Sequence, residues 1–246
     1  LSGALAWGLM IFPTMALLGA LKPLVWQPQL FDLALLLLSL DWRRQETLAN
    51  QLAQALAKED KPQARALLQP FVNRQTTTLS ALGLGKAGVE TLVMGFGRNV
   101  IGVLFWYGVL GGSGAFLYRL IAELARAWSP SRATFQPFGF TAVRILALLI
   151  ILGKQAGTIF KAVLEQSRSW PLPGPAWLLC AVGNKLQLAL GGPAIYGEQK
   201  SVRAKIGGRI APAAIHIAQV QSLIAWRIFV WIALESLLLL LIYRGV

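Results

Sequence analysis

Few side chains in this sequence could carry acid–base or metal chemistry. Its 246 residues include 10 Asp and Glu, one histidine (His216) and one cysteine (Cys180). One histidine and one cysteine cannot hold zinc without carboxylates, and a single cysteine excludes a disulfide framework. No serine–histidine–acid arrangement can be built around His216, which we interpret as a buried, hydrogen-bonded side chain rather than a catalyst.

Two glutamates lie beside glycine-rich segments that could form a site. Glu90 lies among ten glycines between positions 83 and 114, and Glu198 ends a run that begins at Leu190-Gly191-Gly192-Pro193. The glycines at 83–88 lack the Lys-Ser/Thr ending of a phosphate-binding loop and follow no strand. We therefore predict that the glycines between 83 and 114 mainly let neighbouring helices approach closely.

A second group of polar residues falls inside or at the edge of apolar segments. Charged side chains there cost about 2.5–3.5 kcal/mol each, so we expect them to face the interior of a helix bundle and to find partners. We favour pairs that hold helices together over a ligand or proton site. These residues are Asp32, Arg98, Asn99, Arg144, Arg227 and Glu235.

The composition is that of an integral membrane protein. Apolar residues make up 56% and charged residues 13%, with a mean hydropathy of +0.59. A soluble protein of this size needs about twice as many charges, and a disordered chain needs far fewer apolar residues. The net charge of +13 is typical of basic loops that meet anionic lipid. No motif indicates nucleic-acid binding, so we expect the bilayer rather than a nucleic acid as partner.

The apolar segments predict an all-α polytopic membrane protein with about five transmembrane helices in a single membrane domain, 1–246. Two helical loops, 41–99 and 154–209, contain 16 of the 23 Lys and Arg residues. The positive-inside rule therefore places them in the cytoplasm of a bacterial inner membrane. Because the chain starts without Met inside an apolar run, we expect a further N-terminal segment. The predicted spans are about 1–21, 24–40, 100–118, 138–153 and 212–243.

The first loop predicts a helical hairpin. In 43–58 the residues Leu48, Leu52, Ala55 and Leu56 share one helical face. Asp60 is a suitable N-cap and Pro62 a first-turn residue for a second helix over 62–69. We interpret this hairpin as a membrane-surface or packing element rather than a docking site for a partner. In the second loop, the apolar stretch 176–190 predicts a re-entrant or surface helix followed by a tight turn.

Short motifs run in a fixed order along residues 41–230, and together they resemble the CobD/CbiB family of adenosylcobinamide-phosphate synthases. Their order is more specific than any one match. Tyr118-Arg119 and the pair Gly139 and Arg144 also resemble family positions. The main motifs are Val72-Asn73-Arg74-Gln75-Thr76, Glu90-Thr91-Leu92, Leu104-Phe105-Trp106, Gly111-Gly112 and Leu188-Ala189-Leu190-Gly191-Gly192-Pro193 with Tyr196-Gly197-Glu198.

The resemblance implies a reaction and a set of residues for it. The family joins an aminopropanol-type phosphate to a corrinoid carboxyl group with ATP, which calls for Mg²⁺. If this chain is active, the resemblance makes Arg74, Glu90, Thr91 and Glu198 the candidate catalytic residues. It likewise makes Gly191, Gly192 and Tyr196 the candidates for binding a cofactor.

The chain departs from the family pattern mainly at acidic and amide positions. Met94-Gly95 and Arg98 stand where the family has Glu-Asn and Asp, and Gly207-Gly208 replaces a late Gly-Asp. Acidic or amide residues are also replaced by Ala122, Ala125 and Leu146-Ala147. These losses favour a chain that keeps the scaffold without synthase activity, needs no cofactor, and serves as an accessory, regulatory or complex-forming subunit beside other membrane proteins.

Two other functions stay open at this point. One is an active synthase with a rearranged site, using ATP and Mg²⁺. The other is a small-solute or ion carrier that uses Asp32, Arg144 and Glu235. The sister group of AmpE proteins shares the pattern around Leu104-Phe105-Trp106 and Gly111-Gly112, whereas the 188–198 stretch is more similar to the synthases.

Overall fold

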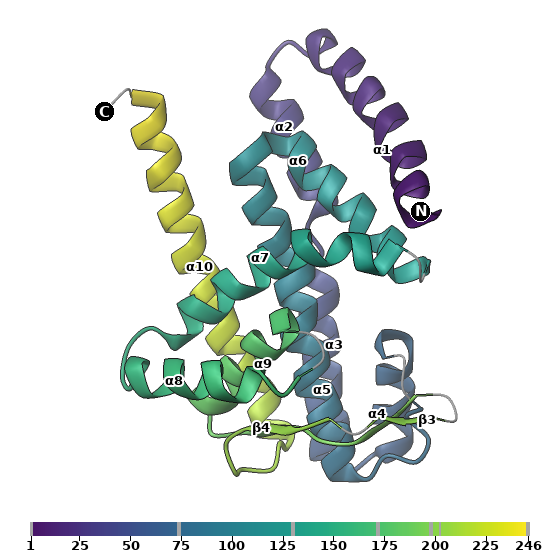
Figure 1. Ribbon diagram of the computed structural model, residues 1–246, viewed down its shortest axis with the longest axis vertical. Helices are drawn as coiled ribbons and strands as arrows, with labels where there is room; N and C mark the ends of the chain where they lie inside the picture. Colours follow the sequence, from purple (N-terminus) through teal and green to yellow (C-terminus); the bar gives the residue numbers. More distant parts are fainter. Residues whose placement is uncertain are drawn as a thin grey trace. The chain divides into compact units, whose positions relative to one another are not determined.

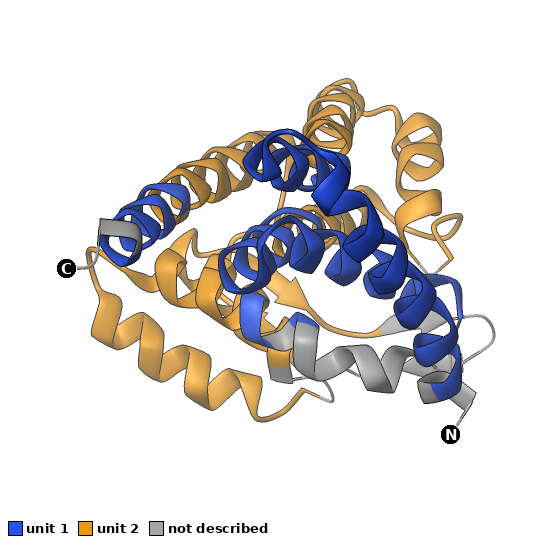
Figure 2. Cartoon of the chain, turned by 90° about the horizontal axis from the view of Figure 1, so that it is seen from above, with its two compact units in different colours: residues 1–41, 98–142, 232–246 blue, residues 42–97, 143–231 orange. Residues whose placement is uncertain are grey.

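The chain folds mainly into helices, in two compact units. The computed structural model describes residues 2–72, 75–128, 131–170, 173–196, 199–201 and 203–244. Unit 1 comprises residues 1–41, 98–142 and 232–246, and unit 2 comprises 42–97 and 143–231 (Figure 2). Two helices, α7 (Ser131–Ile151) and α10 (Ala214–Arg244), contribute residues to both units.

Unit 1 is built around the packing of helix α2 (Pro28–Ser39) on helix α6 (Gly102–Ala127). Its buried core is formed by Val103, Ala115 and Tyr118 of α6, and Leu36 and Leu40 pack against it. The unit also contains α1 (Ser2–Leu21) and the short turn η1 (Lys22–Leu24), while the π-helical turn η3 (Gly97–Ile101) leads from unit 2 into α6.

Helix α6 is interrupted at two adjacent glycines. Gly111 has φ 69° and ψ −160°, which is not helical and which suits only glycine. The next residue, Gly112, lies against the backbone of Asp32, and a Cβ there would come within 2.5 Å of the Asp32 Cα. The pair Gly111-Gly112 therefore makes the kink and also the close contact between α6 and α2, as predicted for the glycines.

Unit 2 combines helices with two small antiparallel ribbons (Figure 1). Strand β1 (Ala189–Gly191) pairs with β4 (Lys205–Gly207), with Leu190 opposite Ile206, and β2 (Ala194–Tyr196) pairs with β3 (Gln199–Ser201). The sequence did not predict these strands, since each is only three residues long. The helices that lie wholly in unit 2 are α3 (Trp42–Ala57), α4 (Lys61–Leu68), η2 (Gln69–Phe71), α5 (Ala81–Phe96), α8 (Ala156–Ser167) and α9 (Pro173–Lys185).

The predicted hairpin is confirmed in α3 and α4. Leu48, Leu52 and Ala55 are buried on one face of α3. The Asp60 carboxylate accepts a hydrogen bond from the Gln63 N–H at 2.9 Å and so caps α4, with Pro62 in its first turn. The helical part of 176–190 is confirmed as α9, and the turn that follows it leads into β1.

Three stretches of helix in the described part of the chain are long and apolar enough to cross a membrane: Leu5–Leu24, Ala81–Ala127 and Ala214–Ile242. The first and third match predicted spans, and the second begins well before the predicted start near residue 100. The predicted spans 24–40 and 138–153 correspond to shorter apolar helices, α2 with 12 residues and Thr141–Ile151 within α7. An all-α polytopic membrane protein is thus confirmed, whereas a count of five spans stays a prediction.

We expect Gly112→Ala to destabilise the protein by about 1–3 kcal/mol, because the added methyl group has no room against the backbone of Asp32. The matched control is Gly19→Ala on α1, where a Cβ meets nothing within 4 Å and the change should be neutral or slightly stabilising. Thermal unfolding in detergent measures both. Equal melting temperatures for the two variants would contradict the close α2–α6 contact.

The single cysteine offers a test of the packing of unit 2. Cys180 is fully buried in α9, and burial raises the pKa of its thiol to about 12. Because only the thiolate reacts, folded protein at pH 8 should react with N-ethylmaleimide at least about 100-fold more slowly than protein unfolded in dodecyl sulfate. Mass spectrometry counts the single adduct. Rapid labelling of the folded chain would show that α9 is not packed as described.

Candidate functional site

The buried carboxylate of Glu90 joins segments of unit 2 that are distant in sequence. Glu90 lies on α5 with its side chain 10% exposed. Its Oε1 accepts a hydrogen bond from the Gly191 N–H at 2.9 Å, and its Oε2 lies 3.4 Å from Nη2 of Arg203. One carboxylate therefore holds the end of β1 and the segment just before β4 against helix α5.

Arg203 is fixed on three sides. Besides the ion pair with Glu90, its Nε donates to the carbonyl oxygen of Gly192 at 3.3 Å. Its guanidinium also lies over the ring of Trp170, 5.0 Å from the ring centroid, and the Trp170 Nε1 donates to the carbonyl of Ala204 at 3.1 Å. We call Glu90, Trp170, Gly191, Gly192 and Arg203 the Glu90 site.

The turn of the Glu90 site requires glycine at two successive positions. Gly191 and Gly192 have φ values of +68° and +90°, which strain any other residue. A Cβ on Gly191 would also lie 2.5 Å from the carbonyl oxygen of Ala204. Since the Gly192 N–H donates to that same carbonyl at 3.2 Å, the backbone of the turn is closely fitted to the strand beside it.

The side-chain amide of Gln166 supports the β1–β4 ribbon at its other end, on strand β4. The Oε1 of Gln166 accepts hydrogen bonds from the Gly207 N–H at 2.8 Å and from Nδ2 of Asn184 at 3.1 Å. Gly207 has φ +81°, and its neighbour Gly208 donates its N–H to the Leu188 carbonyl at 2.9 Å. Both ends of the β1–β4 ribbon are thus held by a side-chain oxygen that binds a glycine N–H.

The geometry indicates that Glu90 orients the turn rather than acting as a general base. Its charge is balanced by Arg203, and one of its oxygens is occupied by a backbone N–H. Within the described residues no group of three or more His, Cys, Asp or Glu could hold a metal ion. At the Glu90 site the two carboxylate oxygens contact the Gly191 N–H and Arg203, so we assign no step at this site to a metal.

Comparison with known proteins identifies the family. The model of the family described as CobD/Cbib protein matches residues 1–224. This chain belongs to the CobD/CbiB family. The resemblance seen in the motifs is thereby confirmed, and the two segments joined at the Glu90 site, 90–92 and 188–193, are two of those motifs.

Curated proteins similar to this chain are named as cobalamin biosynthesis proteins. The chain is 32% identical to Cobalamin biosynthesis protein CobD of Stutzerimonas stutzeri, over 99% of this chain and 82% of that protein. It is 28% identical to the protein of that name from Chromobacterium violaceum, over 96% and 79%. A Probable cobalamin biosynthesis protein CobD of Methanothermobacter thermautotrophicus is 29% identical over 56% and 52%. No solved structure matches.

Two of the departures from the CobD/CbiB pattern have a steric reason in this fold. A Cβ at Gly95, where the family has asparagine, would collide with the amide of Gln45, a buried side chain of α3. A Cβ at Gly208, where the family has aspartate, would collide with the backbone of Gln187. Neither position has room for a side chain in this fold.

The structure brings together some of the predicted site residues. Glu90, Gly191 and Gly192 meet, whereas Thr91 follows on α5 as a half-buried residue with no role seen in the geometry. Tyr196 ends β2, where its backbone pairs with Gln199. Arg74 and Glu198 lie outside the described residues.

Arg203 and Trp170 of the Glu90 site were not predicted from the sequence. Arg203 lies among other basic residues near β4, and Trp170 is one of nine tryptophans, so neither stands out by type or spacing. His216 is hydrogen-bonded as predicted, since its Nδ1 accepts from the Ala213 N–H at 2.9 Å, but it is half-buried rather than buried.

Polar residues predicted inside the membrane have partners in unit 1. Asp32 pairs with Nζ of Lys22 at 3.1 Å and accepts a hydrogen bond from the Gly112 N–H at 3.2 Å. Arg98 donates through Nε to the Oδ1 of the buried Asn99 at 3.2 Å. Glu235 of α10 is half-buried, with its carboxylate beside Gly108 of α6. The contacts of Asp32 and Glu235 join different helices, whereas Arg98 and Asn99 are neighbours within η3.

Two arginines of unit 2 find neutral partners instead of carboxylates. Arg227 donates through Nη2 to the carbonyl of Leu152 at 3.0 Å. Arg144 is exposed, with its guanidinium 5.7 Å from the centroid of the Trp177 ring, which differs from the interior position that we predicted. An aromatic face can attract the guanidinium without a carboxylate.

Removal of the charge of Glu90 should be strongly destabilising, because Arg203 would keep a buried and uncompensated charge. We expect Glu90→Gln to cost about 3 kcal/mol, and the double variant Glu90→Gln/Arg203→Gln to cost less than the sum of the two single changes. Thermal unfolding in detergent measures all three. The control is Glu165→Gln, an exposed residue on α8. Additive effects of the two changes would contradict a coupled pair.

Proposed function

We propose that this protein acts in cobalamin biosynthesis as a membrane-bound synthase of the CobD/CbiB type. It would join an aminopropanol-type phosphate to a carboxyl group of the corrinoid, which ATP activates. The observation that carries this proposal is the hydrogen bond between Glu90 and Gly191, because it unites two family motifs that lie 101 residues apart in one buried site.

The residues of the Glu90 site would serve this reaction by fixing the turn at Gly191-Gly192. The ion pair with Arg203 holds that turn on α5 and thereby sets the direction of the chain that continues through β2. Glu90 and Arg203 are then positioning residues. Gly95 and Gly208 have no room for a side chain in this fold, so the glycines at these two positions are explained by packing and do not count against this proposal.

A second candidate is a non-catalytic subunit of the same pathway, without a cofactor and bound to other membrane proteins. It is favoured by the state of Glu90, whose charge is already balanced by Arg203. For either function we propose the bacterial inner membrane as the location, with 41–99 and 154–209 in the cytoplasm, because these loops contain most of the basic residues.

An assay of amide formation separates the two candidates. Purified protein in detergent is given ATP, Mg²⁺, the corrinoid acid and aminopropanol phosphate, and the product is measured by mass spectrometry. We expect turnover by the wild-type chain, a loss of at least about tenfold in Glu90→Gln through misplacement of the turn, and no change in Glu165→Gln.

The protein from Stutzerimonas stutzeri provides a reference preparation for the same assay. If that relative forms product and this chain forms none under the same conditions, the synthase proposal is wrong and the non-catalytic subunit takes its place. If Glu90→Gln stays folded and as active as the wild type, the Glu90 site has no part in the reaction.

A further inference from the structure

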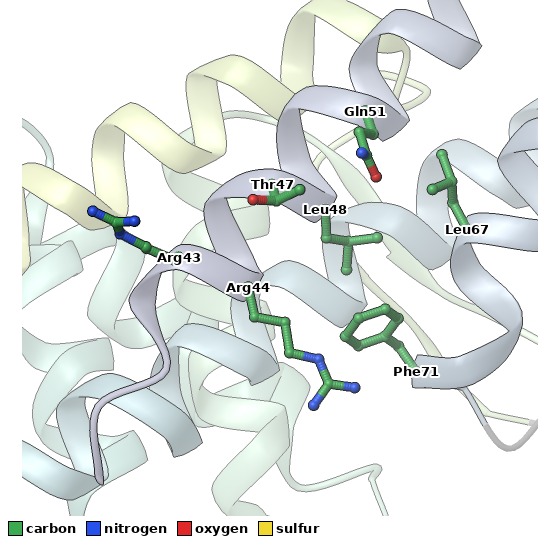
Figure 3. A pocket seen from close by; sticks show the side chains of 7 residues that line it. All are labelled: Arg43, Arg44, Thr47, Leu48, Gln51, Leu67 and Phe71. Atoms are coloured by element: carbon green, nitrogen blue, oxygen red, sulfur yellow. The ribbon is translucent and has the colours of Figure 1, made fainter. Parts of the chain in front are cut away.

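The hairpin of α3 and α4 carries a pocket that the proposed function does not use. The pocket has a volume of about 280 Å³ and opens on the surface of unit 2 (Figure 3). We call it the hairpin pocket. Its lining residues are Arg43, Arg44, Thr47, Leu48, Gln51, Leu67 and Phe71.

One end of the hairpin pocket is cationic. Arg43 and Arg44 are exposed in the first turn of α3, and no acidic residue is among those that line the pocket. The guanidinium of Arg44 lies over the ring of Phe71, 4.7 Å from the ring centroid, and Figure 3 shows Arg43 extending to the other side of the turn. In the part of the chain that the structure describes, Arg43 forms no ion pair. Arginines in such a setting bind phosphate groups through several N–H donors at once.

The rest of the pocket is apolar with two neutral polar side chains. Leu48, Leu67 and Phe71 form the wall, while Thr47 and Gln51 can donate hydrogen bonds to further oxygens. An anionic group at the arginines and a hydrocarbon part along the wall would together match this lining. An inorganic anion alone would leave the apolar wall in water.

The position of the pocket in the sequence favours a membrane lipid as the ligand. Arg43 follows Ser39, the last residue of the apolar helix α2, by four residues. Several leucines of α2 are exposed, among them Leu37 at 63% and Leu38 at 74%, as expected for a helix that contacts lipid. Basic residues that directly follow an apolar helix are typical of segments that bind anionic headgroups.

We propose that the hairpin pocket binds the phosphate group of an anionic phospholipid. Arg44 makes the main contact, Arg43 adds a second charge, and the wall of Leu48, Leu67 and Phe71 takes the start of the acyl chains. Such a site would fix the hairpin at the membrane surface independently of any catalytic activity. It is distinct from the Glu90 site, which shares none of its lining residues.

Binding of dihexanoyl-phosphatidylglycerol to the full chain in neutral detergent tests this proposal. Each arginine beside an anionic lipid contributes about fivefold in affinity. We therefore expect Arg44→Gln to weaken binding about fivefold and Arg43→Gln/Arg44→Gln about 30-fold, as measured by native mass spectrometry. The control is Lys58→Gln/Lys61→Gln, which removes two exposed charges from the same hairpin away from the pocket and should change the affinity less than twofold.

Three further measurements test whether the ligand is an anionic lipid rather than a neutral lipid or soluble phosphate. Dihexanoyl-phosphatidylcholine should bind at least about tenfold more weakly, since it has no net charge, and affinity for the anionic lipid should fall with added salt. Displacement of the lipid by millimolar inorganic phosphate would show a site for soluble phosphate and overturn the lipid proposal. Equal losses in the arginine and lysine variants would show general charge attraction and overturn the pocket itself. Circular dichroism verifies that each variant is folded.

Discussion

A buried carboxylate that binds a glycine N–H and an arginine organises unit 2. An ion pair with both side chains about 90% buried is costly to desolvate, and it is tolerated only when nearly every polar atom has a partner. Glu90 meets this condition through Gly191 and Arg203, and Arg203 meets it through Gly192 and the ring of Trp170. The glycines, the tryptophan and the arginine are therefore needed together, because the loss of one partner leaves a buried charge uncompensated.

Glycine has a second role in this chain, which is to allow backbones to meet. In unit 1 the kink at Gly111 and the contact of Gly112 with Asp32 join α6 to α2. In unit 2, Gly88 faces Leu52 and Gly97 faces Leu178, where a Cβ would lie within 2.9 Å. Small residues let helices approach closely where apolar contact alone gives little preference in a lipid environment. Close packing of helices therefore accounts for Gly88, Gly97 and Gly112.

The departures from the CobD/CbiB pattern have a different meaning once their surroundings are known. In the sequence, Gly95 and Gly208 are simply places where an amide and an acid are missing. In the structure, neither position has room for a side chain, and Gln45 brings an amide to the first of them. A missing polar residue therefore does not by itself indicate a lost activity, since a neighbouring helix can supply the group or take its space.

The amino-acid sequence alone was enough to predict the class of the protein, its family, the α3–α4 hairpin with its Asp60 cap, and Glu90 and Gly191-Gly192 as candidate site residues. These features depend on composition, on helical periodicity and on local motifs, all of which can be read over a few residues. The partners of distant residues came from the fold: Arg203 for Glu90, Trp170 for Arg203, and Trp177 for Arg144. The four short strands were also decided there. Contacts between residues 30 to more than 100 positions apart leave no periodic signal, and strands of three residues are too short to show one. Strands β1 and β4 are held by their glycines and by the side chains of Glu90 and Gln166.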